Sequence, residues 1–302
     1  MEALTPPFEI SRIRAWLLAL RPKTLIASIA PVITGTGLAV NHGVFAFFPA
    51  LAALLGAICI QIGTNLGNDY YDFIRGGDTK DRVGPVRVTQ AGIIEPELVR
   101  AGMVKALGLA TLFGIYLVLV GGLPVLWIGL GSIACAVLYT GGPFPLAYHG
   151  LGDLFVFIFF GLIAVAGTYY VQALSWSADA FLAGSGIGAL STALIVVNNL
   201  RDIDTDSCAG KRTLAVRIGR TLTKLEYIIM LLISFTVPLV GWMALTWPAA
   251  VLCSLLVIPL SVRPLRKVIG HVEAQDLLPA LGETAQLVGI YSLALAAGFA
   301  LS

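Results

Sequence analysis

Residues 65–72 read Asn-Leu-Gly-Asn-Asp-Tyr-Tyr-Asp and close an apolar run that begins near residue 45. A helical run of roughly 20 residues crosses a hydrocarbon core about 30 Å thick. A second acidic stretch, residues 199–206, reads Asn-Leu-Arg-Asp-Ile-Asp-Thr-Asp and closes another apolar run. An acid at the centre of a membrane helix costs about 2.5–3.5 kcal/mol on insertion scales, so clustered acids need a physical reason. The two stretches indicate a membrane helix bundle with a polar site at the helix ends.

The composition supports a multispanning membrane protein. The 302 residues are 58% hydrophobic and 12% charged, with a mean hydropathy of +0.90, which excludes an ordinary soluble enzyme. We predict an all-α fold in one domain, residues 1–302, in which residues 1–23 form an amphipathic arm at the membrane interface. The nine predicted spans lie near residues 24–41, 45–66, 103–121, 124–140, 152–172, 179–199, 226–245, 248–262 and 284–301.

The distribution of basic residues predicts the orientation, because Lys and Arg are retained on the cytoplasmic side. With the N-terminus inside, all 19 Lys and Arg residues fall in inner segments or in the first helical turn after them. We therefore expect a multipass protein of the inner (cell) membrane with the N-terminus and both acidic stretches in the cytoplasm. The net charge of +2 averages this asymmetry, and it indicates no nucleic-acid partner.

The two acidic stretches align without a gap, so that Asn68 and Asp72 match Asp202 and Asp206. Positions four apart lie on one face of a continuous helix, which gives two stripes of oxygen ligands. Mg²⁺ prefers such ligands and commonly bridges carboxylates to substrate phosphates. The basic residues that follow each stretch favour a diphosphate as the bound group. The alternative is that the acids only cap helices and pair with these neighbouring cations.

Several segments together resemble the UbiA superfamily of intramembrane aromatic prenyltransferases, over residues 12 to about 220. Within it, the chain is similar to the branch that prenylates 1,4-dihydroxy-2-naphthoate in menaquinone or phylloquinone synthesis. The matching segments are residues 21–25, 68–72, 78–85, 139–143, 150–153, 198–206 and 210–211.

This resemblance implies a nine-helix bundle around a central cavity, and a magnesium-dependent reaction. A polyprenyl or phytyl group would pass from its diphosphate to dihydroxynaphthoate, with loss of CO₂ and diphosphate. The implied Mg²⁺ ligands are Asp69, Asp72, Asp202 and Asp206, assisted by Asn68 and Asn199. The implied diphosphate-binding cations are Lys80, Arg82 and Lys211.

Two further residues have both a catalytic and a structural interpretation. The ring of Tyr139 would stabilise an allylic cation, or would be an ordinary interfacial aromatic. Asp153 would orient the aromatic acceptor or take its proton, or would cap the helix that follows it.

Other functions remain open at this stage. A related enzyme would prenylate 4-hydroxybenzoate or homogentisate instead. A secondary transporter also carries intramembrane acids, but these lie near mid-span, and here nearly all lie at the cytoplasmic ends of the spans. A lipid head-group phosphotransferase would use aspartates and Mg²⁺ with a different glycine-arginine spacing. The sequence sets neither the prenyl chain length nor the oligomeric state.

Overall fold

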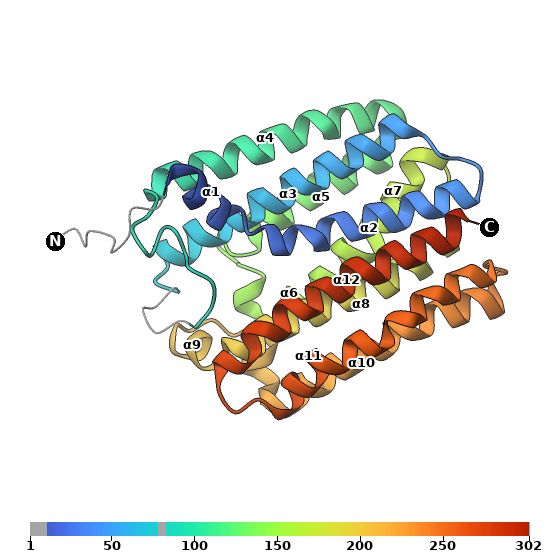
Figure 1. Ribbon diagram of the computed structural model, residues 1–302. Coiled ribbons are helices and arrows are strands. Elements are labelled where there is room, and N and C mark those ends of the chain that lie inside the picture. Colours follow the sequence, from blue (N-terminus) through green and yellow to red (C-terminus); the bar gives the residue numbers. More distant parts are fainter. Residues whose placement is uncertain (1–10, 78–82, 302) are drawn as a thin grey trace.

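The computed structural model describes residues 11–77 and 83–301, and this part of the chain is helical and contains no strand (Figure 1). The all-α prediction is confirmed. Lys80 and Arg82 lie outside the described residues, as do Asp78, Asp81 and the first ten residues of the predicted arm.

The helices run in chain order as a bundle whose long members lie roughly parallel (Figure 1). Their bounds are α1 Arg12–Leu20, α2 Pro22–Asn41, α3 Phe47–Ile74, α4 Pro96–Gly121, α5 Leu123–Leu138, η1 Ala147–His149, α6 Gly152–Val156, η2 Phe157–Ile163, α7 Ala164–Ala173, α8 Ala178–Arg201, α9 Ile203–Cys208, α10 Leu214–Ala244, η3 Ala249–Val257, α11 Ile258–Gly270, η4 Ala274–Asp276 and α12 Leu277–Ala300.

Eight helical segments of the described chain are long and apolar enough to cross a membrane, where nine spans were predicted. The difference is the span predicted at 124–140, which corresponds to α5 and has only 16 residues. A helix of that length is about 24 Å long and falls short of a hydrocarbon core of about 30 Å. Gly122 limits α5 at its start, with a positive φ of 70°.

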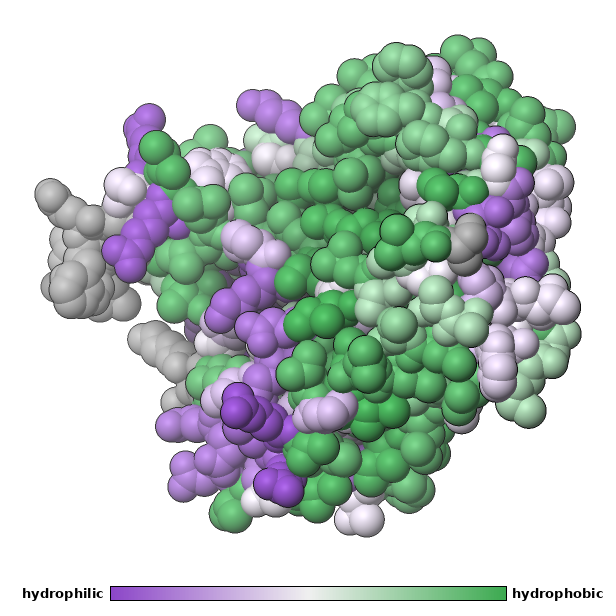
Figure 2. Space-filling view, turned by 45° about the vertical axis from the view of Figure 1, so that its right-hand side comes forward, coloured by the Kyte–Doolittle hydropathy of each residue, from purple (hydrophilic) through white to green (hydrophobic). Residues whose placement is uncertain are grey.

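The outer surface of the bundle is apolar over a broad band, with polar side chains towards its two ends (Figure 2). Large hydrophobic side chains such as Leu119, Trp127 and Met243 are mostly exposed. In water such a surface would drive association, whereas lipid solvates it. The protein is therefore an integral multipass membrane protein.

The central helix of the bundle is α8, which packs against α10, η2, α12 and α2. A Cβ atom on Gly161 of η2 would lie 2.4 Å from the Cα of Gly188 on α8, so the backbones touch where only glycine fits. Small residues allow this close approach between membrane helices. The segment η2 is a π-helix within the span 152–173, and it carries Phe159 and Phe160 onto the wall of a cavity.

Helix α1 packs against the polar end of α3. Ala15 and Ala19 are buried, whereas Ile13 and Leu17 are exposed on the opposite side. That two-faced pattern suits a helix in the membrane interface, which stays a prediction for the arm.

Candidate active site

The first acidic stretch continues α3 to Ile74, so that Asp69 and Asp72 lie near one another at the end of an unbroken helix. Both carboxylates are buried. The carboxylate of Asp69 accepts hydrogen bonds from the backbone N–H groups of Val88 at 3.2 Å and Thr89 at 3.1 Å. Charge-assisted bonds of this kind are stronger than neutral ones. These two bonds hold the loop at residues 88–89 against the end of α3.

Asp72 is the most connected acid of the first stretch. Its carboxylate accepts from the Arg87 guanidinium at 3.1 Å and from the Tyr148 hydroxyl at 3.0 Å. The ammonium of Lys211 lies 4.0 Å from the same carboxylate and 5.5 Å from the centre of the Tyr148 ring. The Asp72 carboxylate therefore contacts two cations and a phenol that come from three separate segments of the chain.

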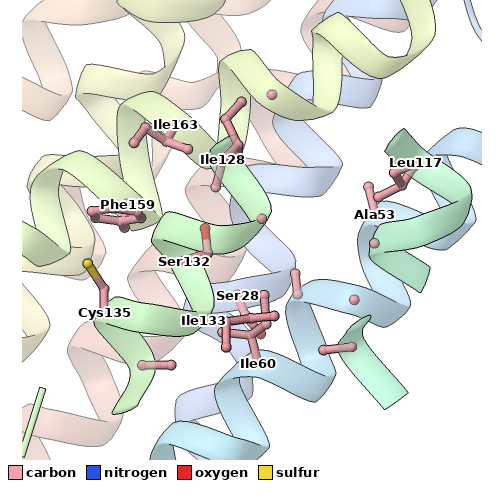
Figure 3. Close-up of a pocket in the computed structure, with 18 of the residues that line it drawn as sticks. Ser28, Ala53, Ile60, Leu117, Ile128, Ser132, Ile133, Cys135, Phe159 and Ile163 are labelled. Carbon is pink, nitrogen blue, oxygen red and sulfur yellow. The ribbon is translucent and has the colours of Figure 1, made fainter. Parts of the chain in front are cut away.

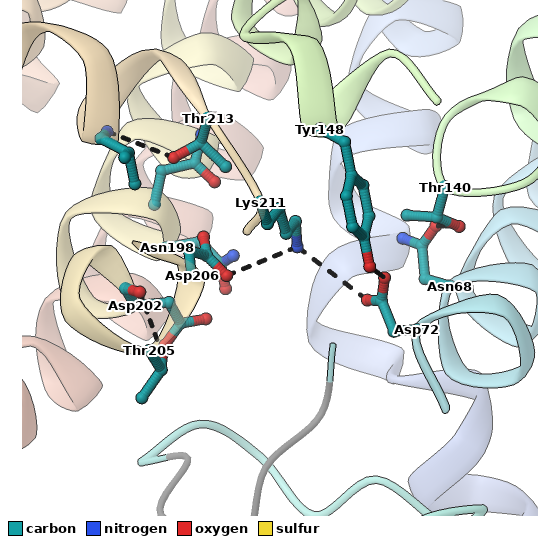
Figure 4. A network of polar contacts seen from close by, with 12 residues as sticks. Asn68, Asp72, Thr140, Tyr148, Asn198, Asp202, Thr205, Asp206, Lys211 and Thr213 are labelled. Carbon is teal, nitrogen blue, oxygen red and sulfur yellow. Dashed lines mark hydrogen bonds and ion pairs between the residues drawn. The ribbon is translucent and has the colours of Figure 1, made fainter. Parts of the chain in front are cut away.

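The second acidic stretch is bent, because α8 ends at Arg201 and α9 begins at Ile203. Asp206 is buried, and its Oδ1 lies 3.7 Å from the Lys211 ammonium. Lys211 therefore joins Asp206 to Asp72 across the space between the two stretches (Figure 4). These two acids are matched in the sequence alignment of the stretches, and the structure brings them together.

Asp202 is paired with its neighbour. Arg201 donates from Nε and Nη2 to the two carboxylate oxygens of Asp202, at 2.7 and 2.6 Å. Nη2 also donates to Asn198 at 2.8 Å. Both members of the pair are buried, so the bidentate contact offsets the loss of their hydration.

The two predicted amide ligands have separate partners. The Asn68 side-chain oxygen accepts from the Thr140 hydroxyl at 2.9 Å. The Asn199 amide donates to both carboxylate oxygens of Asp153, at 3.4 Å each. Asp153 is buried in the first turn of α6, whose N-cap residue is Leu151. Asp153 is therefore a first-turn acid rather than the N-cap residue, and its contact with Asn199 joins α6 to α8.

Tyr139 follows α5 and lies between the acids and the cavity that η2 borders. Desolvation raises the pKa of its hydroxyl, and the carboxylates of Asp153, Asp72 and Asp206 raise it further. The phenol therefore stays neutral at physiological pH and is a hydrogen-bond donor.

The cavity has a volume of about 380 Å³ and an almost wholly apolar wall (Figure 3). Helices α2, α3, α4 and α5 and the span 152–173 contribute to it. Tyr139 and Leu146 belong to the wall, and so do Leu119 and Leu130, whose side chains are also exposed on the outer surface. The cavity wall therefore includes both Tyr139, which is affected by the charges of Asp72 and Asp206, and residues of the lipid-facing surface.

The residues of the acidic cluster suit a hard divalent cation. Within residues 11–77 and 83–301 no group of three or more His, Cys, Asp or Glu side chains is preassembled for a metal. Asp72 and Asp206 nevertheless both lie within 4.0 Å of the Lys211 ammonium, so a positive charge is already held between the two carboxylates. The donor set of carboxylate and amide oxygens, without a thiolate or an imidazole, fits Mg²⁺, whose remaining ligands would come from water and phosphate.

Two residues of the cluster have a partner that the sequence did not predict. Arg87 is one of the cations after the first stretch, and Tyr148 is one of several aromatic residues near Gly150. Their contacts with Asp72 join positions 15 and 76 residues apart, which no local pattern predicts.

Comparison with known families identifies the chain. Residues 28–276 match the UbiA prenyltransferase family. The chain belongs to this family. The predicted resemblance is thereby confirmed.

Within the UbiA family, the chain is similar to proteins named 1,4-dihydroxy-2-naphthoate octaprenyltransferase. The protein from Mycobacterium tuberculosis is 39% identical over 285 residues, which cover 94% of this chain and 96% of the relative. The protein from Escherichia coli is 36% identical over 310 residues, which cover 97% of each.

Solved structures of UbiA homologues share the fold. A homologue from Archaeoglobus fulgidus bound to GPP and Mg²⁺ has a TM-score of 0.66 at 14% identity, covering 94% of this chain and 99% of its own. An apo homologue from Aeropyrum pernix has a TM-score of 0.60 at 16% identity, covering 96% and 98%. At these sequence identities the structural similarity shows only that the fold is shared.

Proposed function

We propose that this chain transfers a polyprenyl group from its diphosphate to 1,4-dihydroxy-2-naphthoate, with release of CO₂ and diphosphate, in menaquinone biosynthesis. The observation that carries the reaction type is the Asp72–Lys211–Asp206 cluster. Tyr139, whose hydroxyl is close enough to Asp72 and Asp206 to be affected by their charge, forms part of the wall of the apolar cavity. The naphthoate acceptor is supported by the relatives of this name, which match nearly the full length of the chain.

The acidic cluster would bind the diphosphate with Mg²⁺. Asp72 and Asp206 would hold the cation, with Asp69, Asp202, Asn68 and Asn199 as further predicted oxygen ligands or supports. Bound there, Mg²⁺ would supply Lewis-acid stabilisation for the charge that grows on the departing diphosphate. The Lys211 ammonium would then exchange a carboxylate partner for a phosphate oxygen. Lys80 and Arg82 remain predicted diphosphate ligands.

The cavity would hold the hydrocarbon end of the donor and the aromatic acceptor. Its apolar wall excludes water, which would otherwise quench an allylic cation. Because Leu119 and Leu130 belong both to the wall and to the exposed surface, a long prenyl chain can leave the cavity into lipid. This is consistent with the octaprenyl donor in the relatives' names.

Tyr139 and Asp153 would act at the boundary between diphosphate and acceptor. The neutral Tyr139 phenol has a π face that stabilises a neighbouring cation, and a hydroxyl that donates to an anionic oxygen. Asp153, held by Asn199, would orient the acceptor or take a hydroxyl proton. No base is needed to remove a proton from the attacked carbon, because that carbon loses CO₂ instead.

The deciding assay uses purified protein with Mg²⁺, a series of prenyl diphosphates, and three acceptors: dihydroxynaphthoate, 4-hydroxybenzoate and homogentisate. We expect prenylated product and CO₂ from the naphthoate alone, with activity lost in excess chelator and restored by Mg²⁺. Prenylation of 4-hydroxybenzoate alone would contradict the assignment of dihydroxynaphthoate as the acceptor. Full turnover in excess chelator would contradict the dependence on Mg²⁺.

The cytoplasmic location of the cluster has its own test. Cys208 is exposed and lies two residues after Asp206. In a variant whose other three cysteines are serine, an impermeant maleimide should label Cys208 in inverted inner-membrane vesicles. Labelling of intact spheroplasts instead would reverse the orientation.

A further inference from the structure

Gln61 is a polar residue on the apolar cavity wall that the reaction described above does not use. It lies on α3, and the residue is only 7% exposed. Its amide Nε2 donates to the Asn65 side-chain oxygen at 3.2 Å. Its Oε1 has no hydrogen-bond partner, and among the described residues that line the cavity it is the only buried side-chain oxygen in that state. A buried carbonyl without a donor is unfavourable, so a donor from a ligand would stabilise it.

Two hydroxyl residues of the wall near Gln61 have already donated their hydrogen to the backbone. Ser28 donates its hydroxyl to the Leu25 carbonyl at 2.8 Å, and Thr64 donates to the Ile60 carbonyl at 2.9 Å. Both residues line the cavity with Gln61, and Figure 3 shows Ser28 and Ile60 on its wall. The oxygens of Gln61, Ser28 and Thr64 are therefore available as acceptors, which favours a ligand that donates a hydrogen bond.

Only one of the proposed substrates carries such a donor. A prenyl chain is a hydrocarbon, and an ionised diphosphate only accepts hydrogen bonds. Dihydroxynaphthoate has two hydroxyl groups, and the 1-hydroxyl lies next to the carboxylate and donates to it within the molecule. The 4-hydroxyl is free to donate to the protein.

The position of Gln61 along α3 suits this contact. Gln61 precedes Asp69 by eight residues, which is about 12 Å along a helix axis. That separation leaves room for the end of the diphosphate and one aromatic ring between the acids and the amide. Oε1 is shielded in the structure. The terminal torsion of glutamine is broad, so the contact with a ligand requires a rotation of the amide that turns the oxygen towards the cavity.

Given the proposed function, we infer that the Gln61 side-chain carbonyl accepts a hydrogen bond from the 4-hydroxyl of the naphthoate acceptor. This contact fixes the ring with its carboxylate-bearing edge towards the allylic end of the donor. Gln61 is then a specificity residue for acceptors that carry a hydroxyl group far from the carboxylate.

The test compares the binding of 1,4-dihydroxy-2-naphthoate with that of 1-hydroxy-2-naphthoate, which lacks only the 4-hydroxyl. Binding to the full-length protein is measured for the wild type, for Gln61→Met, which keeps side-chain length without the amide, and for the control Thr64→Val. We expect the wild type and Thr64→Val to prefer the dihydroxy compound about tenfold, the effect of one buried hydrogen bond. Gln61→Met should bind the two compounds equally and leave the KM for prenyl diphosphate unchanged.

Equal binding of the two compounds by the wild type would overturn the inference without any variant. A tenfold preference that survives in Gln61→Met would overturn it as well. If Gln61→Met instead weakened both compounds equally and lowered the melting temperature, Gln61 would act only by holding Asn65. Wild-type prenylation of the naphthoate is scored separately, so failure of the proposed function is distinguished from failure of this contact.

Discussion

The two acidic stretches have matched spacing, but the chain supports them differently. The first lies on α3, which continues unbroken to Ile74, and its Asp72 is bound by distant residues. The second is divided at Asp202, whose φ of −92° and ψ of 7° separate α8 from α9. Asp202 pairs with the adjacent Arg201, and Asp204 pairs with Arg220 at the surface. Equal spacing therefore does not give equal roles, and Asp72 and Asp206 are the matched pair that share Lys211.

The largest effect is expected where the two stretches meet. Asp72→Asn and Asp206→Asn keep side-chain size and remove the charges proposed to hold Mg²⁺ against diphosphate. Each should lower turnover at saturating substrate about 10²–10³-fold, because stabilisation of the leaving group is lost in the transition state. Prenyl transfer and thermal unfolding in detergent are measured together. Near-normal turnover with a lowered melting temperature would make either acid structural.

Asp202→Asn tests the local pairing that distinguishes the second stretch. Arg201 would keep a buried charge without its bidentate partner, and breaking such a pair costs about 3–5 kcal/mol. We expect the free energy of unfolding to fall by about 3 kcal/mol, more than for Asp206→Asn. A denaturation midpoint equal to that of Asp206→Asn would mean that the pair contributes little to stability.

Lys211→Met tests the connection between the stretches. The variant keeps an apolar side chain of similar length but leaves Asp72 and Asp206 without the shared ammonium. We expect about a tenfold to hundredfold loss in kcat/KM for prenyl diphosphate, since Lys211 is proposed to contact it. Added Mg²⁺ should recover part of this loss by restoring positive charge between the acids. An unchanged kcat/KM would show that Lys211 does not contact the prenyl diphosphate.

Asp204→Asn is the matched control and should have the smallest effect. Its side chain is 79% exposed and pairs with Arg220 at the surface. Exposed pairs contribute little, so stability should change by less than about 0.5 kcal/mol and turnover should stay near that of the wild type. A large loss of turnover would show that α9 presents Asp204 to the substrate.

Much of the cluster follows from local pattern. The apolar runs predict the spans because only helices satisfy the backbone in lipid. The spacing of the acids predicts Asp69 and Asp72 near one another on α3, and it also predicts the match between Asp72 and Asp206. The sequence did not predict the bend at Asp202 or its bidentate contact with Arg201, because a spacing of four residues between acids is compatible with a straight helix and with a bent one.

The sequence by itself determined the membrane class, the helix count to within one short segment, the family and the acids of the cluster, because composition, period and motif are local properties. Tertiary structure decided which groups share a space. Lys211 meets Asp72 and Asp206, Asn199 meets Asp153, and Gln61 lies on a cavity wall built by helices far apart in the chain. Such contacts depend on how buried helix faces pack, and packing couples residues that no sequence spacing relates.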